Sequence, residues 1–307
     1  MDWYYILLII LGIILIFYLG ILWFSFRTVF KRGSNKPLTE LDLTKTHYAP
    51  YIDILYKNMN EMFSRQYEEV YINNGKIRLY GRYFNNNSDT TIIMVHGYRA
   101  VPYSNFSYQA NYFLNHGYNI FFPYQRAHDH SDGHFITFGY KEMSDINKWC
   151  EFIHDKYQVN IILYGTSMGA ATVVNTAGNY HHDYLKGVIE DCGFLNAYDA
   201  IKIAFKNNGY HPNFVMQPLR LCTRLFGFSI IKNSPFDNVS KINVPIVFIH
   251  SKLDKEIPYN SAEILYEKAN NPKLIILNDI GGHTTGFMTS KEEVREEILK
   301  FMKDNMK

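Results

Sequence analysis

The amino-acid sequence predicts an α/β protein, with a mostly parallel β-sheet covered by helices on both faces and one apolar helix before it. Short apolar runs alternate with helical patterns along most of the chain, as in parallel strands joined by crossover helices. One of these runs passes through a glycine-rich turn into a helix of small residues. Residues 3–26 contain no charged side chain, which separates them from the rest of the chain.

The apolar run at the start of the chain predicts a membrane anchor. As a helix, residues 3–26 would extend about 36 Å at about 1.5 Å per residue, more than a bilayer core of about 30 Å. Aromatic residues mark both ends of the run: Trp3, Tyr4 and Tyr5, then Trp23, Phe24 and Phe26. A cleaved signal peptide is the competing interpretation, but only Asp2 precedes the run and no small-x-small site closes it. We therefore expect residues 1–32 to form one uncleaved transmembrane helix with a basic flank.

The flanking charges predict the orientation of this anchor. Nothing basic precedes the run except the amino terminus, and four basic residues follow it: Arg27, Lys31, Arg32 and Lys36. The positive-inside rule then places the remainder of the chain in the cytoplasm. Three cysteines in apolar or mixed segments cannot all pair and suit a reducing compartment: Cys150, Cys192 and Cys222. We expect a single-pass protein of the cell membrane with a cytoplasmic catalytic domain.

Residues 33–67 are expected to hold a linker, Gly33 to Thr46, and an amphipathic helix at about Tyr51 to Arg65. The helix is predicted to pack on the folded body rather than on the membrane. We expect a chain that begins near Thr39 to be soluble and active, because the sheet and the site residues all lie beyond it.

Residues 68–307 contain the predicted sheet. The runs Val70–Ile72 and Ile77–Tyr80 flank Asn74-Gly75, a dipeptide that favours a tight β-hairpin. Six further strands, eight in all, are expected near residues 92–96, 118–123, 160–164, 186–190, 244–249 and 273–277. The last helix is predicted to begin with a capping box made by Ser290 and Glu293.

A candidate nucleophile lies where a strand turns into a helix. The pentapeptide Gly165-Thr166-Ser167-Met168-Gly169 follows the apolar run Ile161–Tyr164 directly. A strand, a G-x-S-x-G turn and a helix form a strained turn that exposes a serine above the sheet. The glycines let strand and helix approach without Cβ clashes. We interpret Ser167 as the nucleophile; the alternative is an ordinary turn with serine as a local cap.

A serine nucleophile needs a base and an orienting carboxylate. Asp254 and His283 each lie just past the carboxyl end of a predicted strand, where open α/β sheets bind ligands. Asp191 also ends a strand and is the alternative acid, whereas Asp254 lies on the following strand, nearer the usual position. We assign His250 a structural hydrogen-bonding role. The loop after residue 95 could offer the Tyr98 amide to an oxyanion hole, with the Met168 amide as the second donor.

These motifs together resemble the α/β-hydrolase superfamily over roughly residues 68–303. The chain is most similar to membrane-anchored bacterial serine hydrolases of the serine aminopeptidase-like and lysophospholipase-like group. The resemblance rests on His96-Gly97-Tyr98, Gln125-Arg126-Ala127-His128, Gly165 to Gly169, Glu190-Asp191-Cys192, His250 to Asp254 with Ile257-Pro258, and Gly282-His283. It implies an α/β-hydrolase fold and the chain order Ser167, Asp254, His283.

Three positions depart from the family pattern. Ser251 and Asp129 stand where the family often has glycine, and Tyr124 stands where it frequently has aspartate. These departures concern loop geometry, so they bear on the shape of the substrate more than on the chemistry.

Residues 195–240 are too long for a simple crossover and are expected to form a small helical cap over the site. The segment is rich in apolar residues, which would either line an acyl pocket or attach the cap to the body: Phe205, Tyr210, Phe214, Met216, Leu219, Leu225, Phe226 and Phe228.

Other classes of function find little support. A formal net charge of +2 gives no reason to expect a nucleic-acid partner. The loop with His128, Asp129, His130, Asp132 and His134 has a metal-like density of ligands, but a catalytic metal needs them around one point. We interpret it as a polar loop and expect neither a metal nor an organic cofactor.

The sequence therefore predicts a membrane-anchored serine hydrolase that cleaves an acyl ester of a lipid, a lysolipid or a small carboxylester. A peptidase or amidase of the same fold is the alternative within the enzymes. A non-catalytic membrane-anchored binding protein on a hydrolase scaffold is the alternative from another class.

Overall fold

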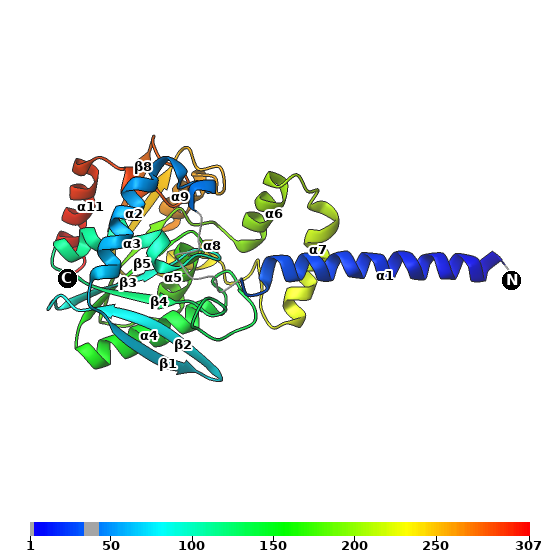
Figure 1. Ribbon diagram of the computed structural model, residues 1–307, viewed down its shortest axis with the longest axis horizontal. Helices are drawn as coiled ribbons and strands as arrows, with labels where there is room; N and C mark the ends of the chain where they lie inside the picture. Colours follow the sequence, from blue (N-terminus) through cyan, green and yellow to red (C-terminus); the bar gives the residue numbers. More distant parts are fainter. Residues whose placement is uncertain (1–2, 34–42) are drawn as a thin grey trace.

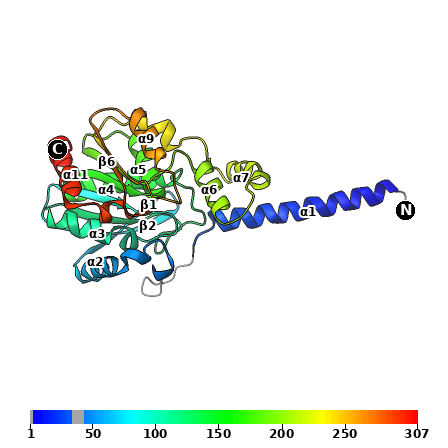
Figure 2. The same cartoon turned by 90° about the horizontal axis from the view of Figure 1, so that it is seen from above.

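The computed structural model describes residues 3–33 and 43–307, so Asp2, Lys36, Thr39 and most of the expected linker lie outside the described residues. Figure 1 shows a layered body from which one long helix, α1 (Trp3–Phe30), projects. The carboxy terminus lies on the far side of the body from α1 (Figure 2). Helix α1 has 28 residues and is, within the described part of the chain, the helix with the length and composition to cross a membrane.

An eight-stranded sheet forms the centre of the body, as the sequence predicts, in the order β1-β2-β4-β3-β5-β6-β7-β8. The pairings β1–β2 and β2–β4 are antiparallel, and the remaining pairings are parallel. The strands are β1 (Glu68–Asn74), β2 (Ile77–Phe84), β3 (Thr90–Val95), β4 (Asn119–Tyr124), β5 (Asn160–Thr166), β6 (Leu185–Asp191), β7 (Ile246–Ser251) and β8 (Lys273–Asn278).

The predicted hairpin is confirmed. Asn74 of β1 lies opposite Ile77 of β2, which leaves Gly75 and Lys76 as a two-residue turn. Gly75 has a φ of 60°, a left-handed conformation that glycine adopts without steric cost.

Helices cover both faces of the sheet because successive strand residues point to opposite sides. Ile93 and Val95 pack in one apolar cluster, while Ile92 and Met94 pack in another. The first cluster includes residues of α4 (Glu142–Tyr157), α5 (Met168–Asn179) and α9 (Asn260–Lys268). The second includes residues of α2 (Ile52–Ser64), α3 (Pro102–Asn115), α10 (Gly286–Thr289) and α11 (Glu292–Asn305).

The segment between β6 and β7 carries two helices, α6 (Ala197–Asn207) and α7 (Asn213–Leu225), followed by the short α8 (Pro235–Asn238). In both Figure 1 and Figure 2, α6 and α7 lie at the end of the body from which α1 emerges. Single 3-10 turns occur at Leu43–Lys45, Ala49–Tyr51 and Val239–Lys241.

The last turns of α1 are part of the body. Leu22, Phe26 and Phe30 are buried in an apolar cluster with residues of α6 and α7. The Phe26 ring lies 4.6 Å from the Phe226 ring between centroids. Beyond the helix, the Arg32 N–H donates to the His134 carbonyl at 3.0 Å. The apolar helix is therefore not a separate module but is packed into the body through its carboxyl end.

The expected capping box at Ser290 is wrong. Helix α11 begins at Glu292 after Lys291, which makes no side-chain capping bond. The Ser290 hydroxyl instead donates to the Gly286 carbonyl at 2.7 Å, where it closes the preceding helix α10. A serine between two adjacent helices can serve the end of the first or the start of the second, and the local sequence does not distinguish them.

Candidate active site

Ser167 occupies the sharp turn between β5 and α5 in a strained conformation, with φ 56° and ψ −118°. Such a φ is costly for a residue with a side chain and must be enforced by its surroundings. The neighbouring glycines explain how the turn is accommodated. A Cβ at Gly165 would lie 2.2 Å from the Gly169 carbonyl oxygen, so larger residues would push strand and helix apart. The Ser167 N–H donates to the Asp191 carbonyl at 2.9 Å, which holds the turn against β6.

The structure brings Ser167, His283 and Asp254 together. The Ser167 hydroxyl lies 2.8 Å from Nε2 of His283, and the Nδ1 of His283 lies 2.7 Å from Oδ2 of Asp254. The three residues follow β5, β8 and β7, whose carboxyl ends meet at one edge of the sheet. His283 and the Asp254 carboxylate are buried, whereas Ser167 is half-buried.

Asp254 is held ionised by its hydrogen bonds. Its Oδ1 accepts the N–H of Glu256 at 2.8 Å and of Ile257 at 2.9 Å, and its Oδ2 lies 3.2 Å from Nε2 of His250. Burial opposes ionisation, but the hydrogen bonds from His250 and His283 outweigh it and hold the pKa of Asp254 well below its usual range. His250 thus contacts the acid rather than the base, consistent with a structural role.

The environment of His283 favours its protonated form. Burial opposes protonation, but Cys192 and the Asp254 carboxylate together raise the pKa of His283 well above 6.5. An imidazolium formed at this position is therefore stabilised by the group that also orients the ring.

Asp191, the alternative acid, makes different contacts. Its carboxylate accepts a hydrogen bond from the Tyr164 hydroxyl at 2.9 Å. Burial raises the pKa of Asp191 to about 6. Asp254 is thus the carboxylate in hydrogen-bond contact with Nδ1 of His283, and Asp191 supports the turn at Ser167 through its backbone.

Tyr98 and Met168 line the same cavity as Ser167. Met168 is the first residue of α5, so its N–H has no acceptor within the helix. A Cβ at Gly97 would lie 3.3 Å from Cβ of Ser167, which shows how closely the loop before Tyr98 approaches the serine. The Gly97 N–H donates to the Asn105 side chain at 2.7 Å, and this bond fixes the loop.

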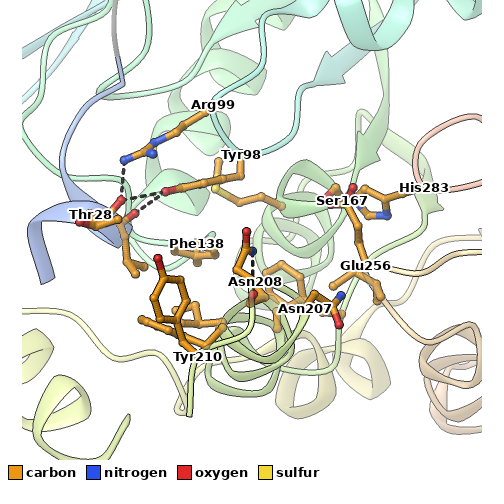
Figure 3. A pocket seen from close by; sticks show the side chains of 18 residues that line it. Thr28, Tyr98, Arg99, Phe138, Ser167, Asn207, Asn208, Tyr210, Glu256 and His283 are labelled. Atoms are coloured by element: carbon orange, nitrogen blue, oxygen red, sulfur yellow. Dashed lines mark hydrogen bonds and ion pairs between the residues drawn. The ribbon is translucent and has the colours of Figure 1, made fainter. Parts of the chain in front are cut away.

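A cavity of about 690 Å³ opens beside Ser167 and has a mostly apolar lining, to which α6, the end of α1 and the loops at Phe138 and Phe194 contribute. This volume is within the range of about 300–1,000 Å³ typical of ligand pockets. Figure 3 shows Thr28 with Tyr98 and Arg99 at one end of the cavity, and Ser167 with His283 at the other. Thr28 and Val29 belong to α1, so the end of the apolar helix forms a wall of the cavity.

Sequence reasoning missed several residues that surround the site. Tyr48, just past the expected linker, is buried and lies 2.7 Å from the Thr284 hydroxyl, beside His283. The Asn105 amide donates to the Tyr48 hydroxyl at 2.7 Å, so the loops of Gly97 and His283 share one hydrogen-bond chain. These residues lie far apart in the chain and match no motif, and the hydrogen bonds appear only once the chain is folded.

Glu256 was also missed, although it follows the predicted acid by two positions. It lines the cavity, is exposed, and lies 3.4 Å from Nδ1 of His47. The hydrogen bond from His47 lowers the pKa of Glu256, so the cavity wall carries a negative charge near Ser167.

In the histidine-rich loop after β4, His128 contacts backbone groups of its own loop and of a neighbouring one. Nε2 of His128 accepts the Arg99 N–H at 3.1 Å, and its Nδ1 lies 2.9 Å from the Arg126 carbonyl. Both ring nitrogens therefore hold backbone beside the cavity. In residues 3–33 and 43–307, the metal-type ligands that cluster are Cys192, Asp254 and His283. Both nitrogens of His283 already contact Ser167 and Asp254, so this group does not present a free imidazole to a metal.

A mostly parallel sheet with helices on both faces, and with a serine on a strained strand-to-helix turn, defines the α/β-hydrolase fold. The chain belongs to the α/β-hydrolase superfamily and is a serine hydrolase, a class that includes esterases and peptidases.

Comparisons with known proteins agree with this assignment. A family model described as serine aminopeptidase, S33, matches residues 86–205. YqkD of Bacillus subtilis strain 168 is 30% identical over 220 residues, which cover 70% of this chain and 72% of the relative.

Two solved structures share the fold. The Pyrococcus furiosus esterase Pf2001 has a TM-score of 0.67 at 21% identity, over 80% of this chain and 96% of its own. The Pyrococcus horikoshii acylaminoacyl peptidase has a TM-score of 0.61 at 17% identity, over 81% of this chain and 44% of its own.

Proposed function

We propose that this protein is a membrane-anchored serine hydrolase that cleaves acyl esters of lipids, lysolipids or small carboxylesters through an acyl-enzyme. One observation carries the proposal: the Ser167 hydroxyl lies 2.8 Å from His283 beside a largely apolar cavity. The hydrogen bond from His283 to Asp254, 2.7 Å, supports the assignment of base and acid.

In the first half of the reaction, the Ser167 oxygen attacks the ester carbonyl carbon while Nε2 of His283 accepts the hydroxyl proton. Asp254 accepts a hydrogen bond from Nδ1–H, which selects the reactive tautomer and stabilises the imidazolium. The N–H groups of Tyr98 and Met168 bind the oxyanion that develops on the carbonyl oxygen. His283 then donates its proton to the leaving alkoxide, and the alcohol departs.

In the second half, water attacks the acyl-enzyme. His283 accepts a proton from the water, and the resulting oxyanion occupies the same pair of N–H groups. Collapse of the intermediate returns the proton to Ser167 and releases the carboxylic acid. The cycle as proposed uses three side chains, two backbone N–H groups and water.

The cavity lining supports an acyl substrate. Phe138, Phe194 and Ile201 are among the side chains that face the space next to Ser167. A hydrocarbon chain transferred there from water gains about 0.8 kcal/mol for each CH₂ group buried. Because the cavity ends at Thr28 and Val29, an acyl chain bound in it would extend from Ser167 toward the anchor helix.

Membrane attachment is proposed from α1. Its run from Trp3 to Trp23 would extend about 31 Å at about 1.5 Å per residue, close to the bilayer core of about 30 Å. Arg27, Lys31 and Arg32 follow at its carboxyl end, and we infer that this end and the hydrolase body are cytoplasmic.

Two measurements test the anchor. The full chain should resist alkaline carbonate, and protease added outside intact cells should leave the body uncut. Release by carbonate would contradict a spanning helix, whereas rapid cleavage from outside would reverse the orientation alone.

A peptidase or amidase is the second candidate, favoured by Glu256. This ionised carboxylate on the cavity wall is placed to bind the amine of a peptide amino terminus. Glu256→Gln should therefore lower activity on an aminoacyl anilide but not on a fatty-acyl ester. If the wild-type chain has a higher kcat/KM for the anilide than for the ester, the peptidase proposal replaces the esterase proposal.

The experiment that tests the proposed chemistry is labelling of the detergent-solubilised full chain with a fluorophosphonate probe. Labelling of the wild-type chain, absent in Ser167→Ala, is expected. A folded wild-type chain that does not react would favour the non-catalytic binding protein.

A further inference from the structure

Helix α7 carries an apolar stripe that the body does not cover. Phe214, Leu221 and Leu225 recur at helical spacing and are 79%, 59% and 87% exposed. Pro218 lies between them on the same face, because residues four or seven apart are neighbours along one side of a helix. We call these four residues the outer stripe.

The opposite face of α7 is firmly packed. Met216, Leu219 and Thr223 are buried, and the first two belong to the apolar cluster that also contains Phe26 of α1. The helix therefore cannot rotate to hide the outer stripe without exposing these residues. An apolar face held outward in this way needs an apolar partner, because water contact with such side chains is unfavourable.

Helix α7 lies directly beside the proposed membrane span. The Tyr18 hydroxyl donates to the Phe214 carbonyl at 2.9 Å, so the start of α7 is level with Tyr18 along α1. Figure 1 shows α7 running across the axis of α1, Figure 2 shows α7 to one side of α1, and in both views α7 lies farther along α1 than α6 does. A helix that crosses a membrane-spanning helix in this way lies in the plane of the membrane.

The depth at which α7 lies fits a membrane interface. Tyr18 precedes Trp23 by five residues, about 7.5 Å along a helix axis. If Trp23 marks the interface, the start of α7 lies about that far inside it. Interfacial helices insert their apolar faces about 5–10 Å into the boundary between headgroups and acyl chains.

The charges around α7 fit an anionic surface. Five basic and no acidic residues occur from position 202 to position 232: Lys202, Lys206, Arg220, Arg224 and Lys232. Arg220 and Arg224 follow the edge of α7 beside the outer stripe, where guanidinium groups can contact lipid phosphates.

We propose that α7 is a second membrane contact, with its outer stripe among the acyl chains of the leaflet that α1 enters and with Arg220 and Arg224 at the headgroups. The proposal rests on the proposed membrane span. Its partner is an anionic lipid bilayer, because the outer stripe lies beside the exposed apolar surface of α1 and next to basic side chains.

This position gives the cap a function. Tyr210, in the turn before α7, lines the cavity and is 65% exposed. The rim of the cavity therefore lies next to the helix that contacts lipid. An acyl substrate can pass from the membrane interface to Ser167 without its chain crossing bulk water.

Spin labels on the full chain test the position of α7. The chain carries Cys222→Ser to remove the half-buried thiol and is reconstituted in vesicles of phosphatidylcholine and phosphatidylglycerol. Three variants of this chain each add one cysteine for a spin label. The positions are Leu221→Cys on α7, Leu11→Cys on α1 and, as an exposed control on the body, Ile54→Cys on α2. We expect the label at 221 to be reached by oxygen and shielded from a water-soluble nickel chelate, and the label at 54 to show the reverse.

The labels at 221 and 11 together distinguish failure of the α7 proposal from failure of the proposed span. A label at 221 open to the chelate, with the label at 11 shielded, would overturn the α7 proposal and leave the span intact. Both labels open to the chelate would overturn the span. A label at 221 shielded from both reagents would indicate a protein partner and would equally overturn the lipid assignment.

Introducing negative charge into the outer stripe gives a kinetic test of the proposal. In the double variant Leu221→Glu and Leu225→Glu, hydrolysis of a water-soluble short-chain ester should be unchanged, because neither residue lines the cavity. Hydrolysis of an ester embedded in anionic vesicles should fall by at least about fivefold, since charge at an inserted face is unfavourable. Ile54→Glu is the matched control. An equal rate on vesicles for all three chains would contradict the proposal.

Discussion

The Tyr98 hydroxyl donates a hydrogen bond of 2.7 Å to the carbonyl oxygen of Val29. This bond joins the carboxyl end of the apolar helix to the residue whose backbone N–H is the proposed oxyanion donor. Arg99 extends the connection, because its guanidinium donates to the Thr28 carbonyl at 2.6 Å. The end of α1 thus helps to hold the loop that carries the proposed oxyanion donor.

We expect Tyr98→Phe to lower kcat on a short-chain ester by about three- to tenfold, because a net hydrogen bond contributes about 0.5–1.5 kcal/mol. The backbone N–H is retained, so the loss measures loop position rather than removal of the donor. Tyr71→Phe on β1, far from the cavity, is the control and should keep the wild-type kcat. Equal kcat for both variants would show that the contact with Val29 does not position the loop.

Replacement of the proposed nucleophile and base should nearly abolish turnover. We expect Ser167→Ala and His283→Ala to lower kcat by a similar factor of about 10⁴ to 10⁶, since the members of such a triad act as one unit. Hydrolysis of a p-nitrophenyl ester, with thermal unfolding as a check of folding, measures this. Substantial activity in a folded Ser167→Ala chain would exclude Ser167 as the nucleophile.

The two candidate acids should differ in their effect. Asp254→Asn removes the charge that orients and stabilises His283, so kcat should fall by about 10⁴. Asp191→Asn should cost far less, because Asp191 contacts Tyr164 rather than His283 and has a pKa of about 6. The reverse order of the two kcat values would assign the acid to β6.

Much of this architecture could be predicted from the sequence because it depends on local pattern. Short apolar runs predict the strands, apolar residues at helical spacing predict the helices, and the two glycines around Ser167 predict a sharp, strained turn. The sequence also places Asp254 and His283 at strand ends, which parallel topology brings to one edge. Each of these inferences uses neighbouring residues and one general rule of sheet geometry.

The contacts of the first thirty-odd residues could not be predicted in that way. An uncharged run predicts a span, but whether its last turns pack on lipid or on protein depends on Phe226, Phe135 and Phe228, which are more than a hundred residues away. A chain that begins near residue 39 would lose Phe26 and Phe30 from the apolar cluster and Val29 from the cavity wall. The expectation that such a chain is soluble and active did not include these contacts.

The pH dependence of kcat/KM should report the neutral form of His283, which is the form that accepts the serine proton. Because the pKa of His283 is raised above 6.5, activity should fall as the pH drops through a midpoint higher than that of a free histidine. Folding stability has the opposite dependence: the tightly held proton stabilises the fold below pH 6.5, and this contribution is lost as the pH rises through the folded pKa.

The residual activity of Asp254→Asn offers a control for this profile. Without the carboxylate the imidazolium is less stable, so the acid limb should move to lower pH. A profile that is the same in both chains would mean that another group controls the acid limb.

The packing of the anchor into the body can be measured with two neighbouring phenylalanines. Phe26 is 1% exposed against Phe226 and Phe135, whereas Phe24, on the same helix, is 71% exposed. Phe26→Ala should lower the free energy of unfolding by about 3–5 kcal/mol, because it leaves a cavity among aromatic rings. The midpoint of thermal unfolding in detergent should fall by roughly 2–4 °C per kcal/mol, and Phe24→Ala should have little effect. If α1 were only a tether, the two variants would unfold at the same temperature; a difference confined to Phe26→Ala would show that the proposed membrane helix and the hydrolase body form one cooperative unit.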